Sequence, residues 1–229
     1  MFHTLSNVQY GEALSLQQYV DNRDGNLLVG LRSIAYTVGW YNLDSGESLS
    51  WRRVGGPQNI LDVGPGLWSF NLLKDFIEMS GINGSLEVSK TNGRITFTVP
   101  GGQEVKLTDG LLALLGLDDG LGGQWLDAGS YSGDHPVNFA PTKTLNIHLD
   151  QVNTTQNIVD GAPSTLLTRV GIERQVFGDI HMARIEHPEF KCLQEGTIGE
   201  LKITVRDDNG KIVDNHNLPI SLVLEICQK

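Results

Sequence analysis

Histidines and nearby acids are the first residues of this sequence whose types and spacing could do chemistry. The chain has six histidines, and two of them, His148 and His181, lie in segments that alternate like β-strands. Zinc sites use His, Cys or carboxylate ligands at short spacing. The candidates here are HLD (148–150) and HMARIEH (181–187), with Cys192 nearby. A histidine in a strand is more often an ordinary surface or hydrogen-bonded residue, so we expect no metal site.

Paired carboxylates are the second chemistry to consider. An acid–base pair needs two carboxyl groups held about 5–10 Å apart in a cleft. Asp118-Asp119 and Asp207-Asp208 instead fall in predicted turns, where Asp favours local hydrogen bonds. The sequence has no GxSxG, Walker, HExxH or CxxC motif, and GPGLW (64–68) lacks the lysine and spacing of a phosphate loop. We therefore expect no catalytic residue, no cofactor and no enzymatic activity.

Aromatic residues form the remaining candidate site. Trp40, Tyr41, Trp51 and Trp68 lie close together in the sequence. Such a group can be a platform on which a sugar stacks, part of a core, or part of a subunit interface, because Trp and Tyr are enriched at interfaces. We favour core or interface over a ligand platform.

Composition narrows the classes of partner. The 229 residues carry 17 Lys and Arg against 27 Asp and Glu, for a net charge of −10, and Arg52-Arg53 stands out as a basic pair. Binding of nucleic acid through phosphates needs a basic face, so we expect no nucleic-acid partner. The first 20 residues have neither the basic start nor the apolar run of a signal peptide, and no segment approaches the roughly 18 apolar residues of a membrane span. The two cysteines, Cys192 and Cys227, are expected to be reduced thiols.

Two segments are predicted to be short helices in connections between strands. SFNLLKDFIEMSG (69–81) has apolar residues at helical spacing, with Ser69 as N-cap and Gly81 as terminator. KLTDGLLALLGL (106–117) can be capped by Thr108 or Asp109 and ended by Gly116.

The rest of the ordered sequence reads as strands. Residues 85–99 form a predicted hairpin around Asn92-Gly93, which supplies the positive φ angles of a tight turn. Residues 26–42 are a long strand or a buried strand pair, and 175–193 are one or two strands interrupted by Pro188. Residues 198–226 are predicted to be a second hairpin around Asp208-Asn209-Gly210. Its alternating apolar residues are Leu201, Ile203 and Val205 opposite Ile220, Leu222 and Leu224.

The fold class predicted from these elements is all-β, a jelly roll or β-sandwich with one or two short helices in its connections. We expect an N-terminal β-rich half over residues 1–120 with a helix near 69–80. A Gly- and Asp-rich loop should follow over 121–142, and a C-terminal β-sandwich half over 143–229. The two halves could also form one continuous domain.

The order of several segments resembles the structural proteins of Polinton/Maverick elements and their adintovirus relatives. LVGLRSIAYTVGWYN (28–42) resembles the opening of those proteins, and VGPGLWSFNLLKDFI (63–77) resembles the segment that follows it there. The hairpin and Leu-rich helix of 95–117, the block over 145–170 and the closing segment of 196–226 occur in the same order. In this sequence, Leu117 stands where the family has an aromatic residue.

The resemblance implies a jelly-roll capsid-type protein, including minor capsid, penton-like proteins. It implies a non-enzymatic subunit of a virus-like particle, penton-like or spike-like, that self-associates and binds other capsid proteins. Such a subunit would be made in the host cytoplasm or nucleus and would reside in the virion. The alternative hypothesis is a β-sandwich module that binds a carbohydrate or receptor.

Overall fold

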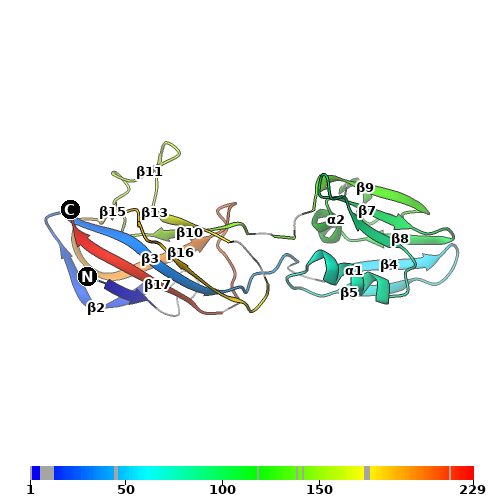
Figure 1. Ribbon diagram of the computed structural model, residues 1–229, viewed down its shortest axis with the longest axis horizontal. Helices are drawn as coiled ribbons and strands as arrows, with labels where there is room; N and C mark the ends of the chain where they lie inside the picture. The colour runs from blue at the N-terminus through cyan, green and yellow to red at the C-terminus, as the bar shows by residue number, and fades with distance from the viewer. Residues whose placement is uncertain are drawn as a thin grey trace. The chain divides into compact units, whose positions relative to one another are not determined.

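The protein is described by a computed structural model over residues 2–5, 13–43, 46–117, 119–137, 139–140, 142–172, 176–216 and 218–229. The chain folds into two compact units (Figure 1). Unit 1 comprises Met1–Trp40 and Thr142–Lys229, and unit 2 comprises Tyr41–Pro141. One unit is thus assembled from the two ends of the chain, and the other is formed by the segment between them.

Unit 1 is built from two antiparallel sheets. The first has the order β1-β17-β3-β14, with β15 also pairing with β3, and the second has the order β13-β10-β16-β2. The strands of the first sheet are β1 (Phe2–Leu5), β3 (Leu27–Thr37), β14 (Ile180–Arg184), β15 (Lys191–Cys192) and β17 (Ile220–Gln228). Those of the second are β2 (Ala13–Asn22), β10 (Thr144–Leu149), β13 (Leu166–Gly171) and β16 (Gly196–Arg206). A small hairpin, β11 (Ile158–Val159) with β12 (Ala162–Pro163), stands apart from both.

Period-two patterning explains why these segments form sheets with one buried face each. Alternate residues of a strand point to opposite faces, and the apolar members of the long strands are almost fully buried. The buried set is Leu145, Ile147 and Leu149 on β10, Leu201, Ile203 and Val205 on β16, and Ile220, Leu222, Leu224 and Ile226 on β17. The all-β sandwich or jelly-roll class with short helices is confirmed.

The C-terminal segment shows where the predicted pairing is wrong. The five residues Leu201, Ile203, Val205, Leu222 and Leu224 are buried as expected, but β16 and β17 do not form a hairpin. β16 pairs with β10 and β2, whereas β17 pairs with β3 and β1. The turn at 207–210 forms, and Arg206 and Ile212 on either side of it make an isolated antiparallel β-bridge. The chain then continues to the other sheet, so the two strands contribute to the core from different sheets.

Unit 2 contains two three-stranded sheets and two helices. Its sheets have the orders β5-β4-β8 and β6-β7-β9. The strands are β4 (Glu47–Arg53), β5 (Asn59–Val63), β6 (Ser85–Val88), β7 (Arg94–Val99), β8 (Gln103–Leu107) and β9 (Gly129–Pro136). The helices are α1 (Phe70–Met79), α2 (Asp109–Leu115) and the short 3₁₀ helix η1 (Asp119–Leu121). One hydrophobic core joins them, including Leu49, Phe97, Leu112 and Leu115.

The helix boundaries follow the predicted signals with one difference. Ser69 accepts a hydrogen bond from the N–H of Leu72 (3.2 Å) and caps α1, which buries Leu73 and Ile77. Thr108 occupies the N-cap of α2, but its hydroxyl bonds the backbone of Ser48 on β4 instead. The carboxylate of Glu47 accepts from the Gly110 N–H (3.1 Å) at the start of this helix, so β4 supplies the capping group.

Gly116 ends α2 in the left-handed conformation, with φ 66°. A side chain there would also overlap the carbonyl oxygen of His135 at the end of β9. The glycine therefore both terminates the helix and lets β9 approach it closely.

The expected division of the chain also differs from the structure. The helix near 69–80 is present, but 121–142 is not simply a loop, because it contains β9 paired with β7. The boundaries lie near residues 40 and 141. The composition of the sequence gives no sign of these boundaries, because the boundaries depend on pairing between strands at opposite ends of the chain. Among the described residues, no helix is long and apolar enough to cross a membrane.

We expect the substitution Ile203→Asp to unfold unit 1. Ile203 is fully buried on β16, and an unpaired carboxylate there should cost roughly 3–5 kcal/mol of folding free energy. Denaturant unfolding of the whole chain measures this. Ile158→Asp is the matched control, because Ile158 in the same unit is 56% exposed. A soluble Ile203→Asp protein as stable as the control would contradict the burial of this strand.

Candidate functional site

The two strand histidines do not converge. His148 lies on β10 in the second sheet of unit 1, and it alternates with the buried residues of that strand, so it faces away from the core. His181 lies on β14 in the first sheet and stacks on Tyr36, with ring centroids 5.5 Å apart. No group of three metal-binding side chains occurs within the residues that the structure describes. The two candidate histidines are thus held on separate sheets.

His148 lies in an environment that disfavours its charged form. Its Nδ1 is 3.1 Å from the Thr165 hydroxyl. Burial lowers the pKa of His148, the guanidiniums of Arg206 and Arg169 lower it further, and Asp150 opposes them. Arg169 and Arg206 are both cross-strand neighbours of Asn146. Two arginines therefore flank Asn146 on the outer face of this sheet, and one of them, Arg169, pairs with Asp160 (3.7 Å).

The two cysteines are free and are separated by a strand. Cys192 on β15 and Cys227 on β17 both pair with Leu28 of β3, one on each side. Two strand spacings place their Cα atoms roughly 9–10 Å apart, beyond the approximately 7 Å that a disulfide can span. The expectation of two reduced thiols agrees with this geometry.

The paired aspartates that the structure describes hold a turn. Asp207 accepts hydrogen bonds from the backbone N–H groups of Asn209 and Lys211. Asp208 accepts from the Lys143 N–H (2.7 Å) and the Thr144 hydroxyl. Burial alone would raise the pKa of Asp208, but these hydrogen bonds outweigh it and the pKa is lowered. Of the other pair, Asp118 lies outside the described residues, and Asp119 begins η1.

The four aromatic residues belong to different parts of the chain. Trp40 is 4% exposed in unit 1 and packs against Tyr36, with ring centroids 5.9 Å apart. Tyr41, Trp51 and Trp68 belong to unit 2. Trp51 on β4 and Trp68 are partly buried against the core of that unit. The group is therefore not one continuous feature of either unit.

Trp68 is fixed in place by neighbours within unit 2. Its indole N–H donates to the Gly64 carbonyl (3.0 Å), and its ring packs on Phe76 of α1 (5.2 Å between centroids). Asn42 bonds the backbone N–H and carbonyl of this residue. The GPGLW turn thus positions a tryptophan beside α1.

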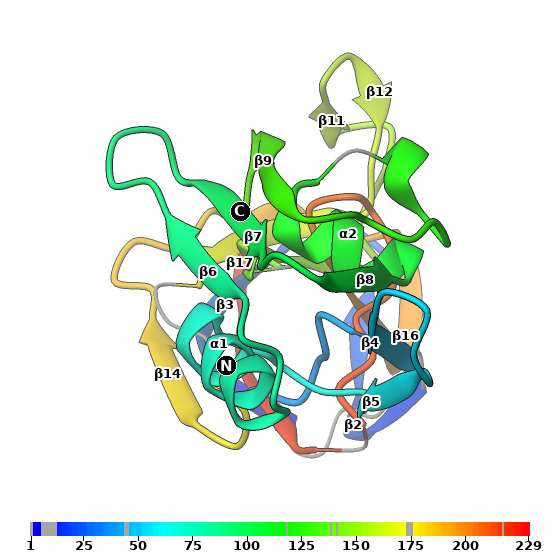
Figure 2. The ribbon, with the colours of Figure 1, turned by 90° about the vertical axis from the view of Figure 1, so that its right-hand side faces the viewer.

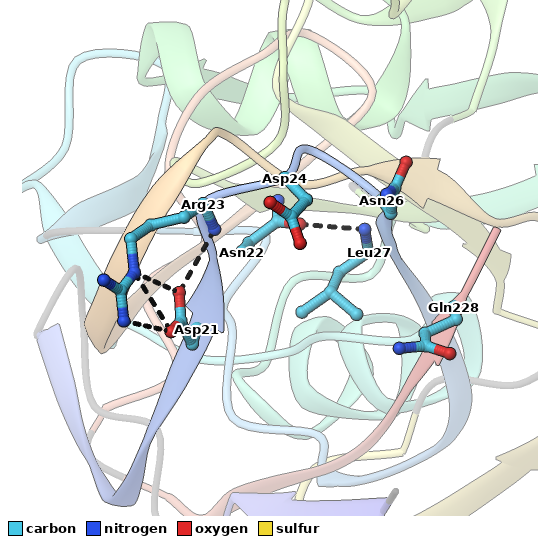
Figure 3. Close-up of a pocket in the computed structure, with 7 residues that line it drawn as sticks. All are labelled: Asp21, Asn22, Arg23, Asp24, Asn26, Leu27 and Gln228. Atoms are coloured by element: carbon cyan, nitrogen blue, oxygen red, sulfur yellow. Dashed lines mark hydrogen bonds and ion pairs between the residues drawn. The ribbon is translucent and has the colours of Figure 1, made fainter.

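A polar pocket of about 410 Å³ lies at the turn between β2 and β3 (Figure 3). Arg23 pairs with Asp21 (2.6 Å) at its wall, and hydrogen bonding to Arg23 lowers the pKa of Asp21. The Asn22 amide donates to the carbonyls of Leu193 and Gln194, and its oxygen accepts from the Leu27 N–H. These polar groups are committed to holding the turn. The lining residues are Asp21, Asn22, Arg23, Asp24, Asn26, Leu27 and Gln228.

Exposed apolar side chains mark the surfaces that sequence reasoning missed. In unit 1 they gather in and just before β14, and in unit 2 they lie on the β4–β5 hairpin and on α1. The members of these groups are Val176, Phe177, Ile180 and Met182 in unit 1, and Val54, Ile60, Leu72 and Met79 in unit 2; Ile158 and Ile212 of unit 1 are exposed singly. The alternation in DIHMAR (179–184) signals a strand, but it does not reveal that the apolar residues face outward.

Comparison with known proteins gives a fold and no sequence relative. No protein-family model matches the chain, and no curated protein matches it. The chain is similar in fold to the mavirus penton protein. The alignment has a TM-score of 0.51 at 10% identity and covers 100% of this chain and 99% of that one. The D2–D3 domains of the flagellar cap protein FliD from Escherichia coli align with a TM-score of 0.30 at 12% identity, covering 91% and 100%, too low to support an argument.

We expect acid to destabilise unit 1 in part through His148. Because its pKa is lowered in the folded state, the unfolded state binds more protons, and stability falls as pH drops below the ordinary value of about 6.5. His148→Gln should make the melting temperature less dependent on pH between about pH 7.5 and 5. Melting curves across that range measure the slope. His187→Gln, at an exposed position of the same unit, is the control, and equal slopes for the wild type and His148→Gln would contradict the assignment.

Proposed function

We propose that the protein is a non-enzymatic structural subunit of a virus-like particle, of the minor-capsid, penton-like kind. It acts through self-assembly and through contacts with other capsid proteins. The observation that carries this proposal is the similarity in fold to the mavirus penton protein over the full length of both chains. Similarity over the full length includes both units, whereas a shared sandwich alone would cover only part of the chain.

The arrangement of polar residues supports a structural role. The residues that could have done chemistry, including Asp207, Asp208, Asn22 and Arg23, instead hold turns and tie strands together. The resemblance in motif order to Polinton/Maverick and adintovirus structural proteins supports the same role. The proposal includes residence in the virion after synthesis in the host cytoplasm or nucleus.

Subunit contacts are proposed to use apolar surface that a monomer leaves exposed. Large exposed apolar patches mark interaction sites on soluble proteins, and both units carry exposed apolar side chains. Within the aromatic group, Tyr41, Trp51 and Trp68 of unit 2 are partly exposed, whereas Trp40 is buried. Unit 2 therefore offers the aromatic part of a contact.

A carbohydrate- or receptor-binding role is the second candidate. Arg52 lies 4.1 Å from the ring centroid of Trp125 and pairs with Glu104 (2.5 Å) on the outer side of β4 and β8. An aromatic ring beside polar side chains suits sugar recognition, although Arg52 already covers this ring. Screening against a glycan array distinguishes this role from assembly.

The assembly proposal predicts a discrete oligomer in solution. Light scattering coupled to size exclusion should give a mass several times that of the chain as concentration rises, and electron microscopy should show closed particles or rings. Closed symmetric oligomers are the usual outcome for identical subunits. A chain that stays strictly monomeric at high concentration would count against the proposal.

Trp51→Ala tests the aromatic contribution to that oligomer. If Trp51 lies at a subunit contact, the oligomer fraction should fall at least about tenfold, the equivalent of about 1.4 kcal/mol, with unchanged circular dichroism. Trp40→Ala serves as the comparison, because this buried residue should lower folding stability first. If Trp51→Ala unfolds the chain with no separate assembly defect, Trp51 belongs to the core alone.

A further inference from the structure

Three Asn-Gly pairs lie in exposed connections of the chain. They are Asn83-Gly84, Asn92-Gly93 and Asn209-Gly210, and the asparagine of each is exposed. The first pair lies between α1 and β6, and the second lies in the turn that joins β6 to β7 (Figure 2). The third lies in the turn after β16. Access to water therefore does not distinguish the three asparagines.

An asparagine that precedes glycine can lose its side-chain amide without an enzyme. The backbone nitrogen of the glycine gives its proton to solvent and attacks the side-chain carbonyl carbon, Cγ, of the asparagine. The N–Cγ bond forms as the Cγ–Nδ2 bond breaks, and the amide nitrogen takes a proton from water and leaves as ammonia. Water then opens the cyclic succinimide at either carbonyl, which gives aspartate or isoaspartate. Glycine favours this attack because it has no Cβ to hinder it.

At two of the pairs, the attacking nitrogen is committed to a backbone hydrogen bond. The Gly93 N–H donates to the Ser89 carbonyl (2.9 Å), and the Gly210 N–H donates to the Asp207 carbonyl (3.1 Å). The side-chain oxygen of Asn92 also accepts a backbone hydrogen bond within its own turn. Each turn must therefore open before its glycine nitrogen can attack, and opening costs the free energy of these hydrogen bonds.

Gly84 stands outside the hydrogen-bonded ladder of the neighbouring strands. The register of β6 with β7 starts one residue later, at Ser85 opposite Thr98. Within the residues that the structure describes, neither the Gly84 N–H nor the Asn83 side chain makes a hydrogen bond. The nucleophile and the electrophile of this pair can therefore react while the chain stays folded.

We propose that Asn83 is a site of spontaneous deamidation in the folded protein, where it converts to aspartate and isoaspartate faster than Asn92 or Asn209 does. This modification needs neither a partner nor an assembled form, so it does not depend on the proposed function. The fold also keeps the reactive pair in place, because a Cβ at Gly84 would lie 2.7 Å from the Thr98 carbonyl oxygen. A side chain that would slow the attack is therefore disfavoured at this position.

Deamidation changes both the charge and the backbone at the entry to β6. Either product adds a negative charge at an exposed position of a chain whose net charge is already −10. Isoaspartate also adds a methylene to the main chain between Ile82, which is 2% exposed, and Ser85, which begins the pairing with β7. The longer backbone must strain or shift one of these two ends, so the isoaspartate form should melt at a lower temperature than the unmodified chain.

Peptide mapping of the whole folded chain tests the proposal. The chain is incubated at mildly alkaline pH, where backbone amides lose protons more readily, and is then digested. Mass spectrometry measures the conversion of each asparagine over time, and chromatography separates isoaspartate from aspartate. Because the nitrogen at the other two sites must first lose one backbone hydrogen bond, Asn83 should react roughly three- to tenfold faster than Asn92 or Asn209.

The same chain unfolded in denaturant is the matched control. Unfolding removes the hydrogen bonds of both turns, so the rates at the three asparagines should converge. Asn83→Gln should remove the modification at this position and leave the other two rates unchanged, because glutamine must close a glutarimide ring, which forms more slowly. Equal rates at the three sites of the folded chain would overturn the proposal. An excess at Asn83 that persists unchanged after unfolding would assign it to the neighbouring sequence and would also overturn the proposal.

Discussion

Unit 1 depends on one pairing, that of β3 with β17. The register joins Leu27–Tyr36 to Ile220–Gln228, strands from near the two ends of the sequence. β3 also carries β14 and β15 on its other side, so the first sheet cannot exist without it. Between the partners lies all of unit 2. The entropy of closing a loop grows only slowly with its length, so a compact segment of this size can be inserted without preventing the pairing.

Local patterns in the sequence predict the elements whose signals lie within a few residues. Ser69 and Gly116 mark helix ends, and Asn92-Gly93 marks the β6–β7 hairpin. The alternation in β16 and β17 gives the buried residues correctly but not the partners. Alternation shows that a strand has one apolar face, and it carries no information about which strand lies beside it. The turn at 207–210 made a hairpin the simplest choice, and the sandwich places the two strands in different sheets.

The candidate site shows the same limit. Residue type made His148, His181 and the paired aspartates visible, but their roles depend on which sheet and which face they occupy. The aromatic group looked continuous because its members are close in the sequence, yet the chain passes from one unit to the other between Trp40 and Tyr41. The sequence pattern also could not predict that the apolar residues of β14 are exposed. An alternating strand with outward apolar residues has the same pattern as one with inward apolar residues, and only the stacking of His181 on Tyr36 fixes the direction.

The net charge of this protein and its local surface features affect association between copies over different distances. A charge of −10 makes copies repel one another, but at physiological ionic strength the repulsion is screened beyond about 8 Å. The repulsion therefore opposes association through large acidic surfaces more strongly than it opposes a contact made over a few residues. The strand β14 carries one charge, that of Arg184, beside the exposed apolar residues Ile180 and Met182, so this stretch adds little to that repulsion.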